Sequence, residues 1–302
     1  NPGQTLRSGE LDNPNVTWER AKKANIQLEA DFMNNKLGFK LDLFSENRDN
    51  ILANRNASVP ATFGTILPVE NIGKVANRGF EFELRFRNKI KTFTYFANAT
   101  YTFARNKIIF IDEPNNIPEY QQRTGHPIDQ FFGFETDGFY QTQDQIVSLP
   151  RYSDVEPKLG QLIYKDINGD GKISDLDRTA IGRSNTPESI FGLTFGGSFK
   201  GFDLNMLLQG ASGYNVMRNE EAFFEFIYGG KALSRIKDNW TPENPGASYP
   251  RLSHLDDSYK RELSNFWLKN PTYLRLRNLE LGYTFSLFKT KTSSKLRLSA
   301  SG

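Results

Sequence analysis

The chain has 302 residues and a net charge of +3 at pH 7, from 38 Lys and Arg against 35 Asp and Glu. Its basic residues are spread along the sequence, whereas nucleic-acid-binding proteins concentrate them on one face or arm, so we expect no nucleic-acid partner. No cysteine is present, which excludes a disulfide framework, a thiolate metal site and a cysteine nucleophile.

The histidines and the mean hydropathy further narrow the class of protein. We interpret His126 and His254, which lie far apart in loop-like stretches, as solvated residues rather than catalytic or zinc-binding groups. No apolar run reaches the roughly 20 residues of a membrane-spanning helix. The mean hydropathy of −0.57 suits a soluble protein, but it also suits a membrane β-barrel, whose strands bury only alternate residues in lipid. The 25 Phe and 12 Tyr favour the barrel, which uses aromatic residues toward lipid.

Alternation of apolar and polar residues is the main structural signal. Successive side chains on a strand point to opposite faces, so each alternating run predicts a strand with one apolar face. The apolar positions, in chain order, are Leu37, Phe39, Leu41 and Leu43 (with Phe44 out of phase), then Phe80, Phe82, Leu84 and Phe86, then Phe93, Tyr95, Ala97, Ala99, Tyr101 and Phe103, then Phe191, Leu193, Phe195, Gly197 and Phe199, then Phe202, Leu204, Met206 and Leu208, and finally Leu296, Leu298 and Ala300.

The run that begins at Tyr273 changes phase near Asn278. A β-bulge at Asn278 would keep Leu274 and Leu276 on the same face as the leucines that follow. Alternatively, Leu274 and Leu276 face the interior of the barrel. The sequence leaves both interpretations open.

Tight turns alternate with long polar stretches between these strands. The expected turns are at Asn34-Asn35, 88–91, Lys200-Gly201 and 286–294, and the long stretches are 47–78, 108–188 and 212–271. Strict alternation places all long connections at one end, as in outer-membrane barrels with short periplasmic turns and long extracellular loops. A soluble antiparallel sandwich also alternates, but several runs exceed the roughly 5–6 residues of a typical strand. We therefore predict an all-β chain that forms an antiparallel transmembrane β-barrel.

One motif suggests metal chemistry. Residues 166–177 read DINGDGKISDLD and match the start of the calcium-loop pattern D-x-[DN]-x-[DN]-G. The final ligand position holds Asp where an EF-hand has Glu, so the loop is closer to dockerin-type loops. We expect a structural Ca²⁺ that stiffens an extracellular loop, and the alternative is a polar turn without metal. The predicted ligands are Asp166, Asn168, Asp170, Lys172 through its carbonyl oxygen, and Asp177.

Two other sets of residues have functional interpretations. Exposed aromatic residues can stack on sugar rings, although they more often anchor a protein at a membrane interface or pack a loop; the candidates are Trp18, Trp240, Trp267, Tyr249 and Tyr259. Paired carboxylates can hydrolyse glycosides, and Glu220, Glu221 and Glu225 form a small cluster, which we interpret as solvated loop residues.

Six landmarks in order give the chain a resemblance to the SusC/RagA family of TonB-linked outer-membrane transporters. They are NPNVTWE at 13–19, NIGKVANRGFE at 71–81, GHPIDQFFGFETDGFYQ at 125–141, YKDINGDGKISDLDRTAIG at 164–182, YPRL at 249–252 and YLRLRNLELGY at 273–283.

This resemblance implies a barrel of about 22 strands, plugged by an N-terminal domain and energised through the TonB–ExbB–ExbD complex. It further implies a SusD-like surface lipoprotein as a lid and an oligosaccharide or oligopeptide substrate. Residues 1–302 would be the C-terminal portion of the barrel, with 108–188 as an extracellular insertion. The TonB box, plug, early strands and last strand would lie outside this chain.

We therefore hypothesise a non-enzymatic role in TonB-dependent nutrient import across a bacterial outer membrane. The chain would supply barrel wall and extracellular loops, with 212–271 near the mouth. The alternative is a calcium-stabilised, β-rich surface-binding protein or adhesin without transport.

Overall fold

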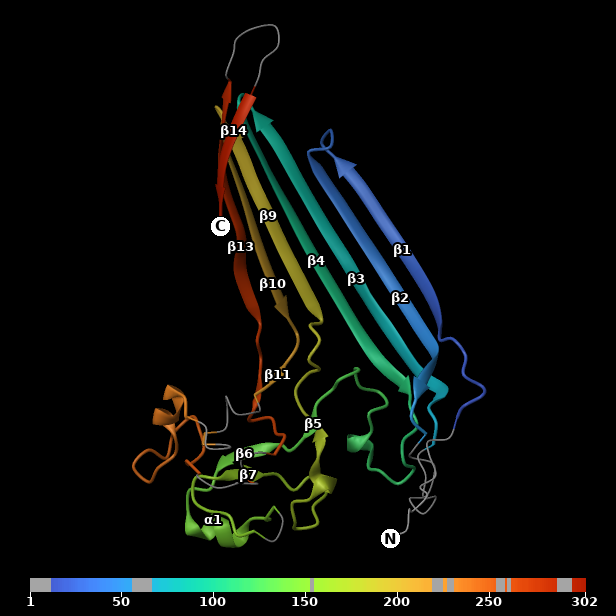
Figure 1. Ribbon diagram of the computed structural model, residues 1–302, viewed down its shortest axis with the longest axis vertical. Coiled ribbons are helices and arrows are strands. Elements are labelled where there is room, and N and C mark those ends of the chain that lie inside the picture. Colours follow the sequence, from blue (N-terminus) through green and yellow to red (C-terminus); the bar gives the residue numbers. More distant parts are fainter. Residues whose placement is uncertain are drawn as a thin grey trace, which may run out of the picture.

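The structure, a computed structural model, describes residues 12–55, 67–152, 155–218, 225–226, 231–253, 259, 262–286 and 295–302. One eight-stranded sheet dominates it (Figure 1). In sheet order the strands are β1 (Arg20–Phe32), β2 (Leu37–Ala53), β3 (Glu70–Ile90), β4 (Phe93–Phe110), β9 (Ser189–Phe199), β10 (Phe202–Ser212), β13 (Tyr273–Ser286) and β14 (Lys295–Ser301). All neighbours are antiparallel, which confirms the predicted fold class. Within the described residues, no helix is long and apolar enough to cross a membrane.

The register gives the sheet one apolar and one polar face. Directly paired residues in an antiparallel ladder point to the same side. One row across the first four strands joins Ile26, Leu43, Phe80 and Phe103, and the adjacent row joins Gln27, Asp42, Glu81 and Thr102. We call the first face the outward face and the second the inner face. Large apolar side chains remain exposed on the outward face, such as Leu28 at 58% and Leu281 at 56%, which suits contact with lipid.

Phe44, which breaks the alternation, is explained by the glycine opposite it. Phe44 pairs directly with Gly79 in the register, and its ring lies where a side chain at Gly79 would stand. Phe96 and Gly196 repeat this arrangement between β4 and β9. An aromatic ring on the inner face therefore covers the gap that each glycine leaves in the sheet.

The phase change in β13 is a β-bulge. Leu207 of β10 pairs with Asn278, whereas the next residue, Leu208, pairs with Leu276. Arg277 is the extra residue. Leu276 therefore shares the outward face with Leu208, and Leu274 shares it with Gly210, which excludes the alternative that the two leucines face inward.

All long connections lie at one end of the sheet, which we call the loop end, and the tight turns lie at the other, the turn end (Figure 1). The turns include Asn34 and Asn35 with φ of 56° and 61°, and Lys200 and Gly201 with φ of 49° and 92°. The expected long stretch 47–78 is wrong in its bounds, because Asn47 pairs with Ala76 and β2 and β3 continue to Ala53 and Glu70. The turn expected at 286–294 lies largely outside the described residues.

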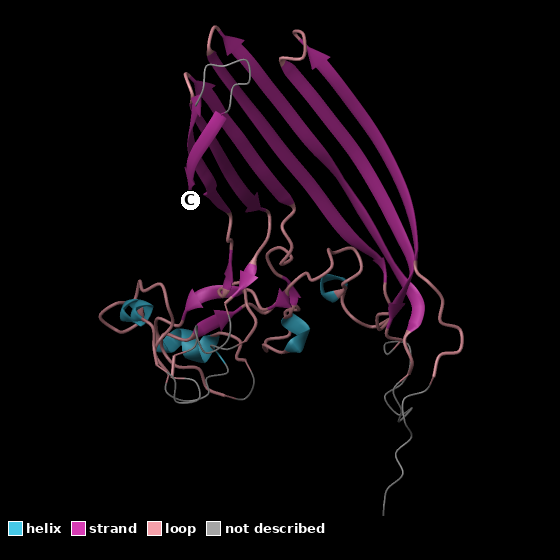
Figure 2. Cartoon of the chain, turned by 45° about the horizontal axis from the view of Figure 1, so that its top comes forward, coloured by secondary structure: helices cyan, strands magenta, loops and turns pink. Residues whose placement is uncertain are grey.

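The connections 111–188 and 213–272 form a lobe at the loop end (Figure 2). Its elements are η2 (Glu119–Gln121), β5 (Phe132–Gly133), β6 (Thr136–Phe139), α1 (Gln143–Ser148), β7 (Leu162–Tyr164), η3 (Asp175–Asp177), β8 (Thr179–Ala180), β11 (Val216–Met217), η5 (Ser234–Asp238) and β12 (Leu268–Lys269). The buried core of the described structure lies here rather than on the sheet. It contains Phe134, Tyr140, Ile146, Leu162, Ile163, Tyr164, Ile173 and Tyr259.

Candidate functional site

Backbone hydrogen bonds join the two long connections into one unit. The Phe134 amide donates to the Leu263 carbonyl oxygen at 2.8 Å, and the Asn265 amide donates back to the Phe134 carbonyl oxygen at 3.0 Å. The Thr136 hydroxyl donates to the Asn265 side-chain oxygen at 2.7 Å. Contacts between residues about 130 positions apart therefore fix the lobe.

Most of the aromatic candidates for sugar stacking pack inside this lobe. Trp240, Tyr259 and Trp267 are only 6%, 1% and 2% exposed. The Trp240 indole N–H donates to the side-chain oxygen of Gln141 at 2.8 Å, so its polar edge is also satisfied. Tyr249 is half-buried with its ring edge-on to Phe266. Loop packing is thus the role of these residues, whereas Trp18 is 91% exposed.

The acidic loop 166–177 folds around its own side chains. The two carboxylate oxygens of Asp166 accept from the amides of Gly169 and Gly171 at 2.7 and 2.8 Å. Asn168 and Asp170 each accept from the amide two residues further on, at 2.9 Å. Gly169 and Gly171 have φ of 74° and 82°, which favours glycine at both positions. Side-chain oxygens thus converge on the backbone at the predicted ligand positions.

Asp177 closes the loop from its far end. It is completely buried, and its Oδ1 accepts from the amides of Ile167 and Asn168 at 2.8 and 3.3 Å. Its Oδ2 accepts from the Ser174 amide at 2.8 Å, which forms a capping box on η3. This carboxylate therefore holds the two ends of the loop together.

These contacts bear on whether the loop suits a cation. Within the described ranges, no three His, Cys, Asp or Glu side chains lie together as a metal-binding group. Asp177 Oδ1 already accepts two hydrogen bonds, but each carboxylate oxygen of Asp166 accepts only one and has a second lone pair. Oxygen atoms with a free lone pair are suitable ligands for Ca²⁺. In Asp177 only Oδ2, which accepts a single hydrogen bond, has a lone pair left for a cation.

Electrostatics around Tyr120 reflect this concentration of carboxylates. Its hydroxyl donates to the Leu176 carbonyl oxygen at 2.7 Å. Burial raises the pKa of Tyr120, and the negative charges of Asp177, Asp170 and Asp166 raise that pKa further. The loop therefore presents a negative field to its neighbours.

Arg178 connects the acidic loop to the core of the lobe. Its guanidinium bonds Asp175 at 2.8 Å and Glu262 at 2.7 Å, and it lies 4.4 Å from the centre of the Phe134 ring. Glu262 also accepts from the Tyr152 hydroxyl at 2.5 Å. Burial and then this hydrogen bond raise the pKa of Tyr152 to about 12. Sequence reasoning missed this network, because Glu262 lies far from the motif.

Two of the sequence landmarks meet through Asn71. Its side-chain oxygen accepts from the Thr17 amide, and its side-chain nitrogen donates to the Thr17 carbonyl oxygen, both at 2.8 Å. Asn71 therefore holds the segment before β1 as a neighbouring strand would.

Among the residues that the structure describes, the remaining sequence candidates, Glu225 and His126, do not form a reaction centre. Glu220, Glu221 and His254 lie outside the described residues. Glu225 is 8% exposed and accepts from the Ser253 amide at 3.3 Å. The His126 ring packs edge-on against Phe132, with centroids 5.4 Å apart, and the His126 carbonyl accepts from the Ile108 amide, so His126 packs rather than standing free in solvent.

A two-faced antiparallel sheet with long strands and all long connections at one end defines the wall of a large β-barrel. The family model "TonB dependent receptor-like, beta-barrel" matches residues 1–302. The chain belongs to this TonB-dependent receptor family, and its similarity to SusC confirms the resemblance to the SusC/RagA family.

Among curated relatives, TonB-dependent receptor P3 of Formosa agariphila is 27% identical over 96% of this chain and 30% of its own length. TonB-dependent receptor SusC of Bacteroides thetaiotaomicron is 24% identical over 93% of this chain and 27% of its own length. A solved structure of the RagAB peptide transporter shares the fold, with a TM-score of 0.71 and 22% identity over 97% of this chain and 33% of that one. The chain therefore spans about 30% of the curated receptor P3.

Proposed function

We propose that this chain forms the C-terminal wall and extracellular lobe of a TonB-dependent importer in a bacterial outer membrane. The observation that carries the proposal is the sheet, whose outward face is apolar over long strands while its inner face is charged. The match to the family model supports the proposal. The open sheet of eight strands supports it too, because the wall of a barrel of about 22 strands contains more strands than this sheet supplies.

The substrate class we propose is an oligosaccharide or oligopeptide, and we assign no catalytic step to these residues. Similarity to SusC and to the RagAB peptide transporter supports this class. The test is uptake of labelled oligopeptides and oligosaccharides by cells with the receptor, without it, and without TonB. We expect uptake of one class to need both proteins. Uptake unchanged by loss of either would contradict import and favour the surface-binding alternative.

The partners we propose are a SusD-like surface lipoprotein over the lobe and the TonB–ExbB–ExbD complex on the periplasmic side. Similarity to SusC and to the RagAB transporter supports the first partner. Affinity purification of the intact receptor from outer membranes should retain a lipoprotein in stoichiometric amount. Recovery of the receptor alone under mild detergent would count against this pairing.

We also propose that the acidic loop binds a structural Ca²⁺ through Asp166, Asn168, Asp170, the Lys172 carbonyl and Asp177. When bound, the ion would neutralise carboxylates that otherwise repel one another within a short turn. Calorimetry on the intact receptor should show loss of one Ca²⁺ site in Asp166→Ala and in Asp170→Ala.

The matched control is Asp175→Ala in the same loop. Asp175 bonds Arg178 and is not among the predicted ligands, so this variant should keep the Ca²⁺ site. Unchanged binding in both Asp166→Ala and Asp170→Ala would refute the assignment.

A further inference from the structure

Basic side chains gather on the outward face at the loop end of β1–β4. In the register Arg78 pairs directly with Arg105, two rows beyond the aromatic pair Phe80 and Phe103 and on the same face. The next row on this face joins Lys22 of β1 to Lys107 of β4 through Asn47 and Ala76. Arg183, in the segment before β9, lies beside Arg105. We call the following set the basic rim: Lys22, Arg78, Arg105, Lys107 and Arg183.

The basic rim lies at the height where an apolar membrane band would end. Along β3 the outward positions are apolar from Phe86 to Phe80, and Arg78 is the next outward residue. With a rise of about 3.3 Å per residue and a tilt of about 40°, the ten-residue step from Asn88 to Arg78 crosses about 25 Å, the height of the apolar band of an outer-membrane barrel. The rim therefore meets the headgroup layer.

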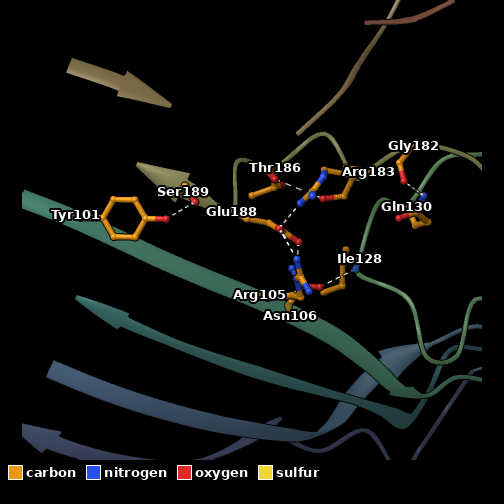
Figure 3. A network of polar contacts seen from close by, with 11 residues as sticks. Tyr101, Arg105, Asn106, Ile128, Gln130, Gly182, Arg183, Thr186, Glu188 and Ser189 are labelled. Carbon is orange, nitrogen blue, oxygen red and sulfur yellow. Dashed lines mark hydrogen bonds and ion pairs between the residues drawn. The ribbon is translucent and has the colours of Figure 1, made fainter. Parts of the chain in front are cut away.

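Like charges face each other in this rim. Two basic residues directly opposite on one face of a sheet destabilise it unless an anion lies between them. Glu188 compensates the charge of Arg105 but not that of Arg78. It accepts two hydrogen bonds from Arg105 at 2.7 Å and one from Arg183 at 2.6 Å (Figure 3). Among the residues that the structure describes, Arg78, Lys22 and Lys107 form no ion pair. Besides Glu188, the carboxylate described on this part of the outward face is that of Asp49, which lies opposite Arg20.

Two adjoining clefts open beside the same arginines. One of about 460 Å³ is lined by Phe103, Arg105, Arg183 and polar side chains from the lobe, and its neighbour of about 410 Å³ adds Lys107. Arg105 and Arg183 are each 55% exposed, and a guanidinium has five donors, of which Glu188 uses two on Arg105. Donors therefore remain for a ligand in the cleft.

The charge is local rather than a general feature of the loop end. The outward positions next to the apolar band on β9 and β10 are Ser189 and Ser212, and Thr272 precedes β13. A ring of lysines and arginines that only anchored the barrel in lipid would continue around these strands. The basic residues instead lie on β1, β3 and β4 and on the segment before β9.

We propose that the basic rim and its clefts bind the phosphorylated sugar headgroup of an outer-leaflet lipid. Arginine donors match phosphate oxygens in a bidentate manner, and the apolar wall directly below accepts the acyl chains. This inference rests on the proposed placement of the sheet in the outer membrane. It adds a lipid site on the outer wall, distinct from substrate passage through the interior.

The test uses the intact receptor in phosphatidylcholine nanodiscs that contain either lipid A or dephosphorylated lipid A, with bound lipid counted by native mass spectrometry. The variant Arg78→Gln/Lys107→Gln leaves the Arg105–Glu188–Arg183 ion pairs intact. The matched control, Lys36→Gln/Lys200→Gln, removes the same charge at the turn end. We expect the rim variant to bind lipid A roughly 30-fold more weakly, as for loss of two cationic groups near an anionic lipid surface, and the control to match wild type.

Different outcomes of this experiment would overturn different parts of the proposal. Equal retention of dephosphorylated lipid A, or equal loss in the rim variant and the control, would overturn the phosphate site. Displacement of lipid A by millimolar inorganic phosphate would show a free-anion site instead. A receptor that does not insert into nanodiscs would overturn the membrane placement, and with it this inference, whereas failed nutrient uptake alone would leave it standing.

Discussion

Gly79 shows at the scale of single residues how closely the sheet is packed. A Cβ added there would overlap the Phe103 carbonyl oxygen and lie 2.5 Å from the Phe44 ring. A backbone oxygen cannot move aside as a flexible side chain can. We expect Gly79→Ala to lower the free energy of unfolding by about 1–3 kcal/mol, as overpacking does, measured as a lower urea midpoint for the intact receptor in detergent.

The control for this substitution is Gly246→Ala in the lobe. A Cβ at Gly246 would meet no atom within 4 Å, so its effect should stay within about 0.5 kcal/mol. Equal midpoints for the two variants would show that the aromatic–glycine pair does not constrain the sheet.

The bulge in β13 makes a prediction at the scale of the element. Because Arg277 is the extra residue, its deletion leaves Leu274, Leu276, Leu279 and Leu281 in unbroken alternation on the outward face. We expect the shortened receptor to fold, losing only the hydrogen bond from Arg277 to the side-chain oxygen of Gln209 at 2.6 Å. The folded fraction is measured by heat-dependent mobility on gels.

Deletion of Glu280 is the matched comparison for the Arg277 deletion. It removes one residue outside the bulge and turns every later side chain of β13 to the opposite face. This variant should fail to fold. Folding of both deletion variants, or of neither, would contradict the assignment of Arg277 as the extra residue of a bulge.

Alternation predicted strands wherever large apolar residues mark the outward face. It gave no prediction for β1, whose outward positions include the small Ala24 and Ala30. It also ended β2 too early and began β3 too late, because the last residues of β2 pair with the first residues of β3 beyond the apolar band. The lobe was less predictable for another reason. Its core forms from contacts such as Phe134 with Leu263, which no local pattern encodes, so sequence placed the acidic loop but missed Arg178 and Glu262.

At the scale of the whole molecule, the sheet is open along its outer strands. β1 and β14 have partners on one side only in the described structure, and the curved sheet does not bring them together (Figure 2). An unpaired edge exposes backbone donors and acceptors that readily pair with another chain. In an intact barrel these edges would be joined to further strands, and the apolar outward face would be covered by lipid.

The isolated chain of residues 1–302 should therefore associate, whereas the intact receptor should not. Refolded in detergent, it should elute as oligomers well above its mass of 34.5 kDa by size exclusion with light scattering, because edge pairing relieves the unsatisfied backbone groups of β1 and β14. In the intact receptor the edges of this sheet would be joined to further strands, so that receptor should be monodisperse in the same detergent. A monomeric chain whose β1 and β14 amides resist hydrogen exchange would contradict this prediction, since it would require that the eight strands close on themselves.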